Sequence, residues 1–215
     1  MTINLDVKLI DDFREKFQKN RNFIEYYRNV DGKNKWNIIC SAMDWIHVTA
    51  EGLPEINFSF TEPNYGRNAL QSLNLMQYIV SIDLLVDSII QLFRVLGGEN
   101  SYPLSKNNEI FNQSEISDDK FFKHIRAVFG THPVNLVSLD GVQNKSQERF
   151  YVSYSTKDIF EKDRYIVFLY SNTAMDEYGI EFEVDIEKIN LYVEKRYQLL
   201  SQLMEKVDEI VSNLN

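Results

Sequence analysis

The chain has 215 residues, 44% of them apolar, which suffices for one domain with a sizeable core. Its formal charge of −9 argues against a protein coated in basic residues for non-specific DNA binding, while a local basic site stays open. Cys40 is the single cysteine, so an internal disulfide and a cysteine zinc cluster are both excluded. The N-terminus does not resemble a signal peptide, and Asp83, Asp87 and Arg94 interrupt the most apolar segment. We therefore expect a cytoplasmic protein with no membrane partner.

Three helices are predicted in the first half of the chain. Apolar residues recur near one helical turn over residues 5–29, 34–50 and 67–96. The third of these segments is the longest and is apolar on most sides, so we expect a central helix that other helices surround. Gly97-Gly98 is expected to end it. Residues 55–65 alternate polar and apolar side chains and predict a short strand or an ordered loop.

The second half begins with a helix over 118–129, with Ser117 as the N-cap and Gly130 as a left-handed C-terminal residue. Short segments rich in aromatic and β-branched residues then predict a small antiparallel sheet at about 149–184. Apolar residues at spacings of three and four predict a long last helix over 186–214. The predicted fold is mainly α: one domain, residues 1–215, forming a helical bundle with a small antiparallel β insertion before the C-terminal helix.

The stretch KHIRAVFGTHPVN holds two of the three histidines of the chain. On a helical wheel, the apolar side chains of this helix fill one sector, with Arg126 beyond one edge and His124 beyond the other. His132 precedes Pro133, which disfavours helical backbone, so the imidazole can fold back toward Arg126. Lys120 and Lys123 lie nearby, and Lys123 and His124 are expected to project away from the apolar sector.

An arginine beside a histidine suits phosphodiester chemistry without a metal. Imidazole can donate or accept a proton near neutral pH, and guanidinium stabilises charge on phosphate oxygens. RNA carries its own nucleophile, the 2′-hydroxyl. Arg126 would then bind the phosphate and His132 would act as general acid or base, leaving a 2′,3′-cyclic phosphate. Lys120, Lys123 and His124 would contact the RNA.

The segment Arg126-Ala-Val-Phe-Gly-Thr-His132 is an arginine, five residues and a histidine at the end of a helix. It resembles the motif of the HEPN superfamily, an arginine and a histidine separated by four to six residues. The resemblance implies a metal-independent endoribonuclease of the toxin–antitoxin, abortive-infection or phage-defence type. It also implies a homodimer in which the two motifs meet. The chain departs from the family at Ala127, where a polar residue is common, and at His132, which precedes proline.

Three alternatives remain open from the sequence. Arg126 could pair with Asp119 or a terminal carboxylate while His132 caps the helix end through its carbonyls. The chain could instead be a non-catalytic dimeric interaction module of regulatory or antitoxin type, with a protein partner in place of RNA. If cleavage required magnesium, Asp83 and Asp87, one turn apart, would be the place to look. Our first expectation uses no metal and no cofactor.

Overall fold

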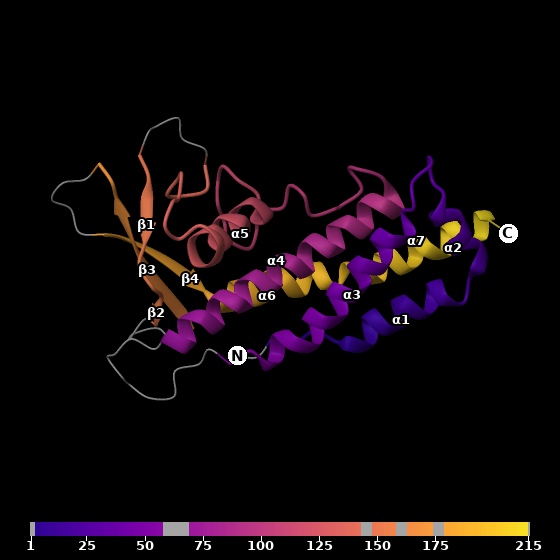
Figure 1. The fold of residues 1–215 in the computed structure, drawn as a ribbon, viewed down its shortest axis with the longest axis horizontal. Helices are drawn as coiled ribbons and strands as arrows, with labels where there is room; N and C mark the ends of the chain where they lie inside the picture. Colours follow the sequence, from indigo (N-terminus) through magenta and orange to yellow (C-terminus); the bar gives the residue numbers. More distant parts are fainter. Residues whose placement is uncertain (1–2, 58–68, 143–147, 158–162, 174–178, 215) are drawn as a thin grey trace. The chain divides into compact units, whose positions relative to one another are not determined.

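The structure, a computed structural model, describes residues 3–57, 69–142, 148–157, 163–173 and 179–214. The predicted class is confirmed: helices dominate, and a small antiparallel sheet precedes the C-terminal helices (Figure 1). Residues 58–68, which include most of the predicted strand or loop at 55–65, lie outside the described residues. Among the helices that the structure describes, none combines the length and the apolar character needed to cross a membrane.

The chain divides into two compact units. The sheet unit contains the first part of α4 (Ala69–Gly97), α5 (Asp118–Arg126), the strands and the first part of α6 (Ile186–Tyr197). The helical unit contains α1 to α3, the second part of α4, the end of α6, and α7. The boundaries are Ile56–Asp83 and Ser105–Tyr192 for the sheet unit, and Thr2–Glu55, Leu84–Leu104 and Val193–Asn215 for the helical unit. The single domain expected from the sequence stays a prediction.

In the helical unit, α1 (Val7–Gln18) and α2 (Arg21–Arg28) replace the single helix predicted over 5–29. The break arises at Asn20, whose extended backbone and side-chain oxygen cap α2 by accepting from the Phe23 amide at 3.0 Å. A local cap of this kind ends one helix and starts the next even where the apolar periodicity continues.

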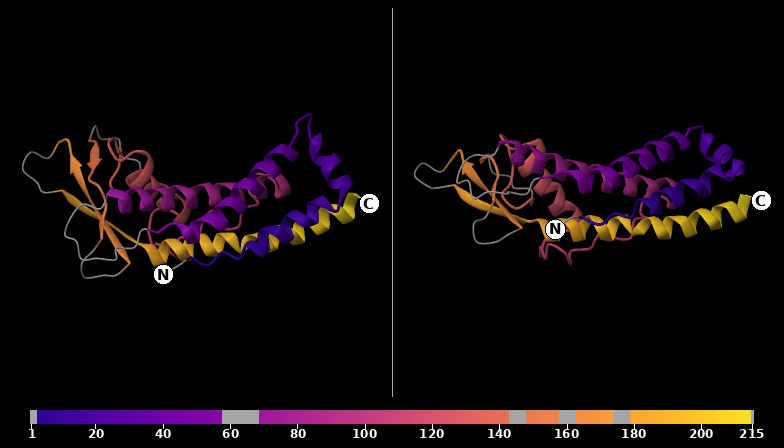
Figure 2. Two further views of the ribbon diagram at one scale, coloured as in Figure 1. Left: turned by 60° about the horizontal axis from the view of Figure 1, so that its bottom comes forward. Right: turned by 90° about the horizontal axis from the view of Figure 1, so that it is seen from below.

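The other helices of this unit are α3 (Trp36–Gly52), a short 3₁₀ turn η1 (Leu53–Glu55) and α7 (Leu199–Leu214). Both views of Figure 2 show α7 beside α1, and the two helices pack together. The core of this unit contains edge-to-face aromatic pairs from α1 and α2, with ring centroids 4.7 Å apart for Phe13 and Phe17 and 4.9 Å for Phe17 and Phe23. The helix predicted over 186–214 is interrupted at Gln198, between α6 and α7.

In the sheet unit, β3 (Arg164–Ser171) is the central strand. β4 (Ile180–Asp185) pairs with β3 along the whole length of β4. β1 (Phe150–Val152) and β2 (Thr156–Lys157) pair with opposite ends of β3. All pairings are antiparallel, as predicted for 149–184, and alternate side chains of β3 are buried. Asp185 caps α6 by accepting from the Glu187 amide at 2.8 Å.

Candidate functional site

The candidate site lies in the sheet unit, where α5 ends. The predicted helix over 118–129 is α-helical only to Arg126, and η2 (Ala127–Thr131) is a single π-helical turn. The amide of His132 closes this turn by donating to the carbonyl of Ala127 at 3.0 Å. Single π turns are rare in proteins, but those that occur are frequently found at functional sites. The extra residue in the turn changes the direction of the neighbouring side chains. Arg126 and His132 flank this turn.

Gly130 does not end the helix in a left-handed conformation, so that prediction is wrong: the left-handed glycines among the described residues are Gly32, Gly98 and Gly141. The reason for a glycine at this position is space. A Cβ at Gly130 would lie 2.9 Å from Cγ2 of Val80 on α4, which is closer than carbon atoms approach in proteins. Because glycine has no Cβ, the backbone of the π turn can pack directly against Val80 of α4.

The two aspartates at the start of α5 have specific partners. Asp118 is buried, and its carboxylate accepts from the Phe111 amide at 3.0 Å and from the Ile110 amide at 3.3 Å. Asp119 accepts from the hydroxyl of Tyr192 at 2.9 Å. Ser117 occupies the N-cap position, as predicted, but its side chain makes no capping hydrogen bond. These contacts attach the first turn of α5 to the preceding loop and to α6.

Arg126 pairs with Asp83 of α4, with Nη1 and Oδ2 2.8 Å apart. The alternative pairing with Asp119 is wrong, since Asp83 is the carboxylate in contact. The Asp83 side chain is 10% exposed and the Arg126 side chain 31% exposed. The Nε of Arg126 is buried and has no hydrogen-bond partner among the described residues. Asp83 thus fixes the guanidinium at one nitrogen, and part of the group stays open to solvent.

His132 is exposed, and its position is set through the backbone around it. The Asn135 amide donates to the His132 carbonyl at 3.1 Å, and the Val152 amide of β1 donates to the Pro133 carbonyl at 2.6 Å. Leu136 and Phe150 exchange hydrogen bonds of 2.9 and 3.0 Å. The sheet edge therefore holds the loop that carries His132. None of the described residues forms a hydrogen bond or an ion pair with the imidazole, so it is available to a ligand.

Lys120 and Lys123 are exposed, as an RNA contact would require, but His124 is not. Only 6% of His124 is exposed, and Nε2 lies 2.8 Å from the Leu139 carbonyl oxygen. Its ring meets Phe182 of β4 edge to face, with centroids 5.4 Å apart. The expectation that His124 projects outward to contact RNA is therefore wrong. The helical wheel considers α5 alone, whereas the following loop and β4 cover this side of the helix.

Burial lowers the pKa of His124, an effect larger than the opposing ones of the Leu139 carbonyl and the Asp140 charge. The folded protein therefore binds this proton less readily than the unfolded chain, whose histidine has a pKa of about 6.5. We expect the free energy of unfolding to fall as the pH decreases from about 7.5 to 5, because the unfolded state gains the proton first.

Chemical denaturation at several pH values measures this slope. The slope should be smaller in His124→Gln, whose amide can still donate to Leu139 but does not titrate. His132→Gln makes the same substitution at an exposed histidine and is the matched comparison. An unchanged slope in His124→Gln would contradict the prediction.

Asp83 and Asp87 of α4 are the candidate metal ligands from the sequence. Asp83 is in contact with Arg126, and among the described residues no group of three or more His, Cys, Asp or Glu side chains could hold a metal ion. The sequence contains one indication that Asp83 has a specific role: it is a lone carboxylate within the apolar run IVSIDLLV. A buried carboxylate requires a partner, but nothing in the sequence identifies Arg126 as that partner.

Models of known protein families, characterised proteins and solved structures were compared with this chain, and none of them matches it.

Proposed function

We propose that the chain is a metal-independent endoribonuclease of the HEPN type, acting in a toxin–antitoxin or phage-defence system. The observation that carries the proposal is the pair of positions flanking the π turn: an arginine fixed by a carboxylate and a histidine free for a ligand. Both groups are placed by the fold, one through Asp83 and the other through the sheet edge. Preorganised groups of this kind cost little reorganisation during a reaction.

In the proposed mechanism, the guanidinium of Arg126 contacts the scissile phosphate through N–H donors that Asp83 does not use. His132 removes the proton of the 2′-hydroxyl or protonates the leaving 5′-oxygen. The 2′-oxygen attacks phosphorus, the bond from phosphorus to the 5′-oxygen breaks, and a 2′,3′-cyclic phosphate and a 5′-hydroxyl result. Exposed Lys120 and Lys123 supply positive charge for the rest of the RNA.

The direct test uses the purified protein and an end-labelled RNA in the presence of EDTA. Cleavage products that carry a 2′,3′-cyclic phosphate would support the proposal. Arg94→Ala and His47→Gln are matched controls elsewhere in the chain, and both should cleave like the parent protein. Absence of cleavage across a range of RNAs, with a folded protein, would favour the second candidate, a non-catalytic interaction module of regulatory or antitoxin type.

The resemblance also predicts a homodimer. Exposed apolar side chains on α4 provide surface that a second copy could cover, with Leu70 67% exposed and Leu73 56% exposed. We expect sedimentation equilibrium at micromolar concentration to give twice the mass of the 25.3 kDa chain. Leu73→Glu should shift the protein toward monomer, and Leu191→Glu, at an exposed apolar position on α6, is the comparison. A monomeric parent protein would contradict this prediction and would exclude a site formed by the motifs of two copies.

A further inference from the structure

One face of α3 in the helical unit is apolar and exposed. Ile39, Met43 and Ile46 face the core and are buried. On the other side, Ile38 is 43% exposed, Trp45 47% and Val48 57%. With Ser41, these residues repeat at spacings of three and four, which is the seam that one helix presents to another. The seam extends over about 15 Å, or three helical turns.

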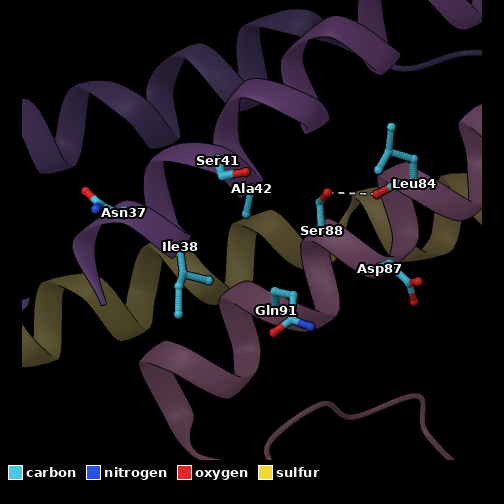
Figure 3. Close-up of a pocket in the computed structure, with 8 residues that line it drawn as sticks. All are labelled: Asn37, Ile38, Ser41, Ala42, Leu84, Asp87, Ser88 and Gln91. Atoms are coloured by element: carbon cyan, nitrogen blue, oxygen red, sulfur yellow. Dashed lines mark hydrogen bonds between the residues drawn. The ribbon is translucent and has the colours of Figure 1, made fainter. Parts of the chain in front are cut away.

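The first two residues of the seam, Ile38 and Ser41, line a groove between α3 and α4 of about 420 Å³, and Trp45 and Val48 continue the seam beyond it. Figure 3 shows its two walls: Asn37, Ile38, Ser41 and Ala42 come from α3, and Leu84, Asp87, Ser88 and Gln91 come from α4. Ser88 donates its hydroxyl to the Leu84 carbonyl at 2.7 Å, so this hydroxyl is satisfied within its own helix. The groove opens to solvent and its exposed surface is mainly apolar, which suits the apolar face of a helix.

Acidic residues lie on both sides of the apolar seam. Asp44 and Glu51, 69% and 58% exposed, lie on the α3 side, and Asp87 lies on the α4 wall. Arg14 contacts Asp44 at 2.7 Å and offsets part of this charge, and Glu51 contacts His47 at 3.2 Å. Arg94 on α4 lies 4.0 Å from Glu99 and adds little net charge. A second copy of α3 would bring like charges together, which disfavours self-association here.

We propose that this groove binds a basic amphipathic helix of a partner protein, with apolar side chains against Ile38, Trp45 and Val48 and lysines or arginines beside Asp44, Glu51 and Asp87. The proposal is independent of the ribonuclease activity. If the protein acts in a toxin–antitoxin or defence system, the groove is the surface at which it binds its protein partner. The partner helix buries the apolar seam. The carboxylates beside the seam attract the basic side chains of the partner helix and disfavour an acidic helix.

The test uses Trp45 as the reporter. Trp36→Phe leaves Trp45 as the single tryptophan, since the chain has two. A synthetic amphipathic helix of leucine and lysine is titrated into this variant, and a helix with the same leucine face and glutamate in place of lysine is the comparison. We expect saturable binding with a blue shift of Trp45 emission for the leucine–lysine peptide and none for the leucine–glutamate peptide.

Charge reversal distinguishes peptide binding at the groove from non-specific attraction of the peptide to the net negative charge of the chain. Asp44→Lys with Glu51→Lys should weaken peptide binding about tenfold, a change of about 1.4 kcal/mol. Glu181→Lys with Glu187→Lys, exposed residues of the sheet unit, changes the net charge equally and should leave binding nearly unchanged. Equal weakening by both pairs, or binding without a shift of Trp45 emission, would overturn the proposal. A blue shift that grows with protein concentration alone would assign the groove to a second copy and overturn it too.

Discussion

Replacing either residue that flanks the π turn should abolish most RNA cleavage. Arg126→Ala is expected to lower the rate constant about 10²–10³-fold, because it removes preorganised donors to the charged transition state. His132→Ala is expected to lower it about 10²–10⁴-fold, the usual contribution of a positioned general acid or base. Single-turnover cleavage of an end-labelled RNA, with protein in excess, measures both effects without a contribution from product release.

Two further variants separate chemistry from folding. Arg126→Lys keeps the charge but loses the planar group that can contact two phosphate oxygens, so its activity should also be impaired. His132→Gln keeps a polar side chain on the exposed loop and loses only the ionisable ring. Both proteins should unfold at the same denaturant concentration as the parent if their effect is on catalysis. Full activity in His132→Ala, or cleavage that EDTA abolishes, would contradict the assignment of these residues.

The sequence predicted the elements whose signal is regular and long. Examples are the apolar face of α3, the long apolar segment of α4 and the alternating strands at 149–184. Their periodic patterns cover enough residues to be recognised despite single irregular positions. The break at Asn20 was missed because a single side-chain cap ends a helix while the apolar periodicity continues across it.

The candidate site was only partly predictable, because its contacts join residues far apart in the chain. Arg126 and Asp83 are separated by 43 positions, and no local pattern links them. His124 is covered by the loop at Leu139 and by Phe182, neither of which a helical wheel includes. Gly130 looked like a helix terminator, whereas Val80 of α4 leaves no room for a side chain there. Each error comes from tertiary packing that overrides a local rule.

Asp83 provides the second prediction with a large effect. The Asp83→Ala protein should lose about 2 kcal/mol of unfolding free energy, since a partly buried guanidinium then lacks the carboxylate that it contacts. Arg126 is 31% exposed, so water compensates part of the loss, and the cost stays below that of a fully buried pair. Denaturant unfolding of the single and double variants measures the coupling between the two residues.

In the Arg126→Met background, Asp83→Ala should cost less than in the parent protein by about 1 kcal/mol, because the interaction between the two side chains is already gone. In the RNA assay, Asp83→Asn should keep more activity than Asp83→Ala, since the amide oxygen can still accept from Nη1 of Arg126 and hold the guanidinium in place. Additive effects on stability would show that the contact at 2.8 Å contributes no free energy. Equal activity of Asp83→Asn and Asp83→Ala would show that Asp83 does not position Arg126 for catalysis, because only Asp83→Asn retains an acceptor at this position.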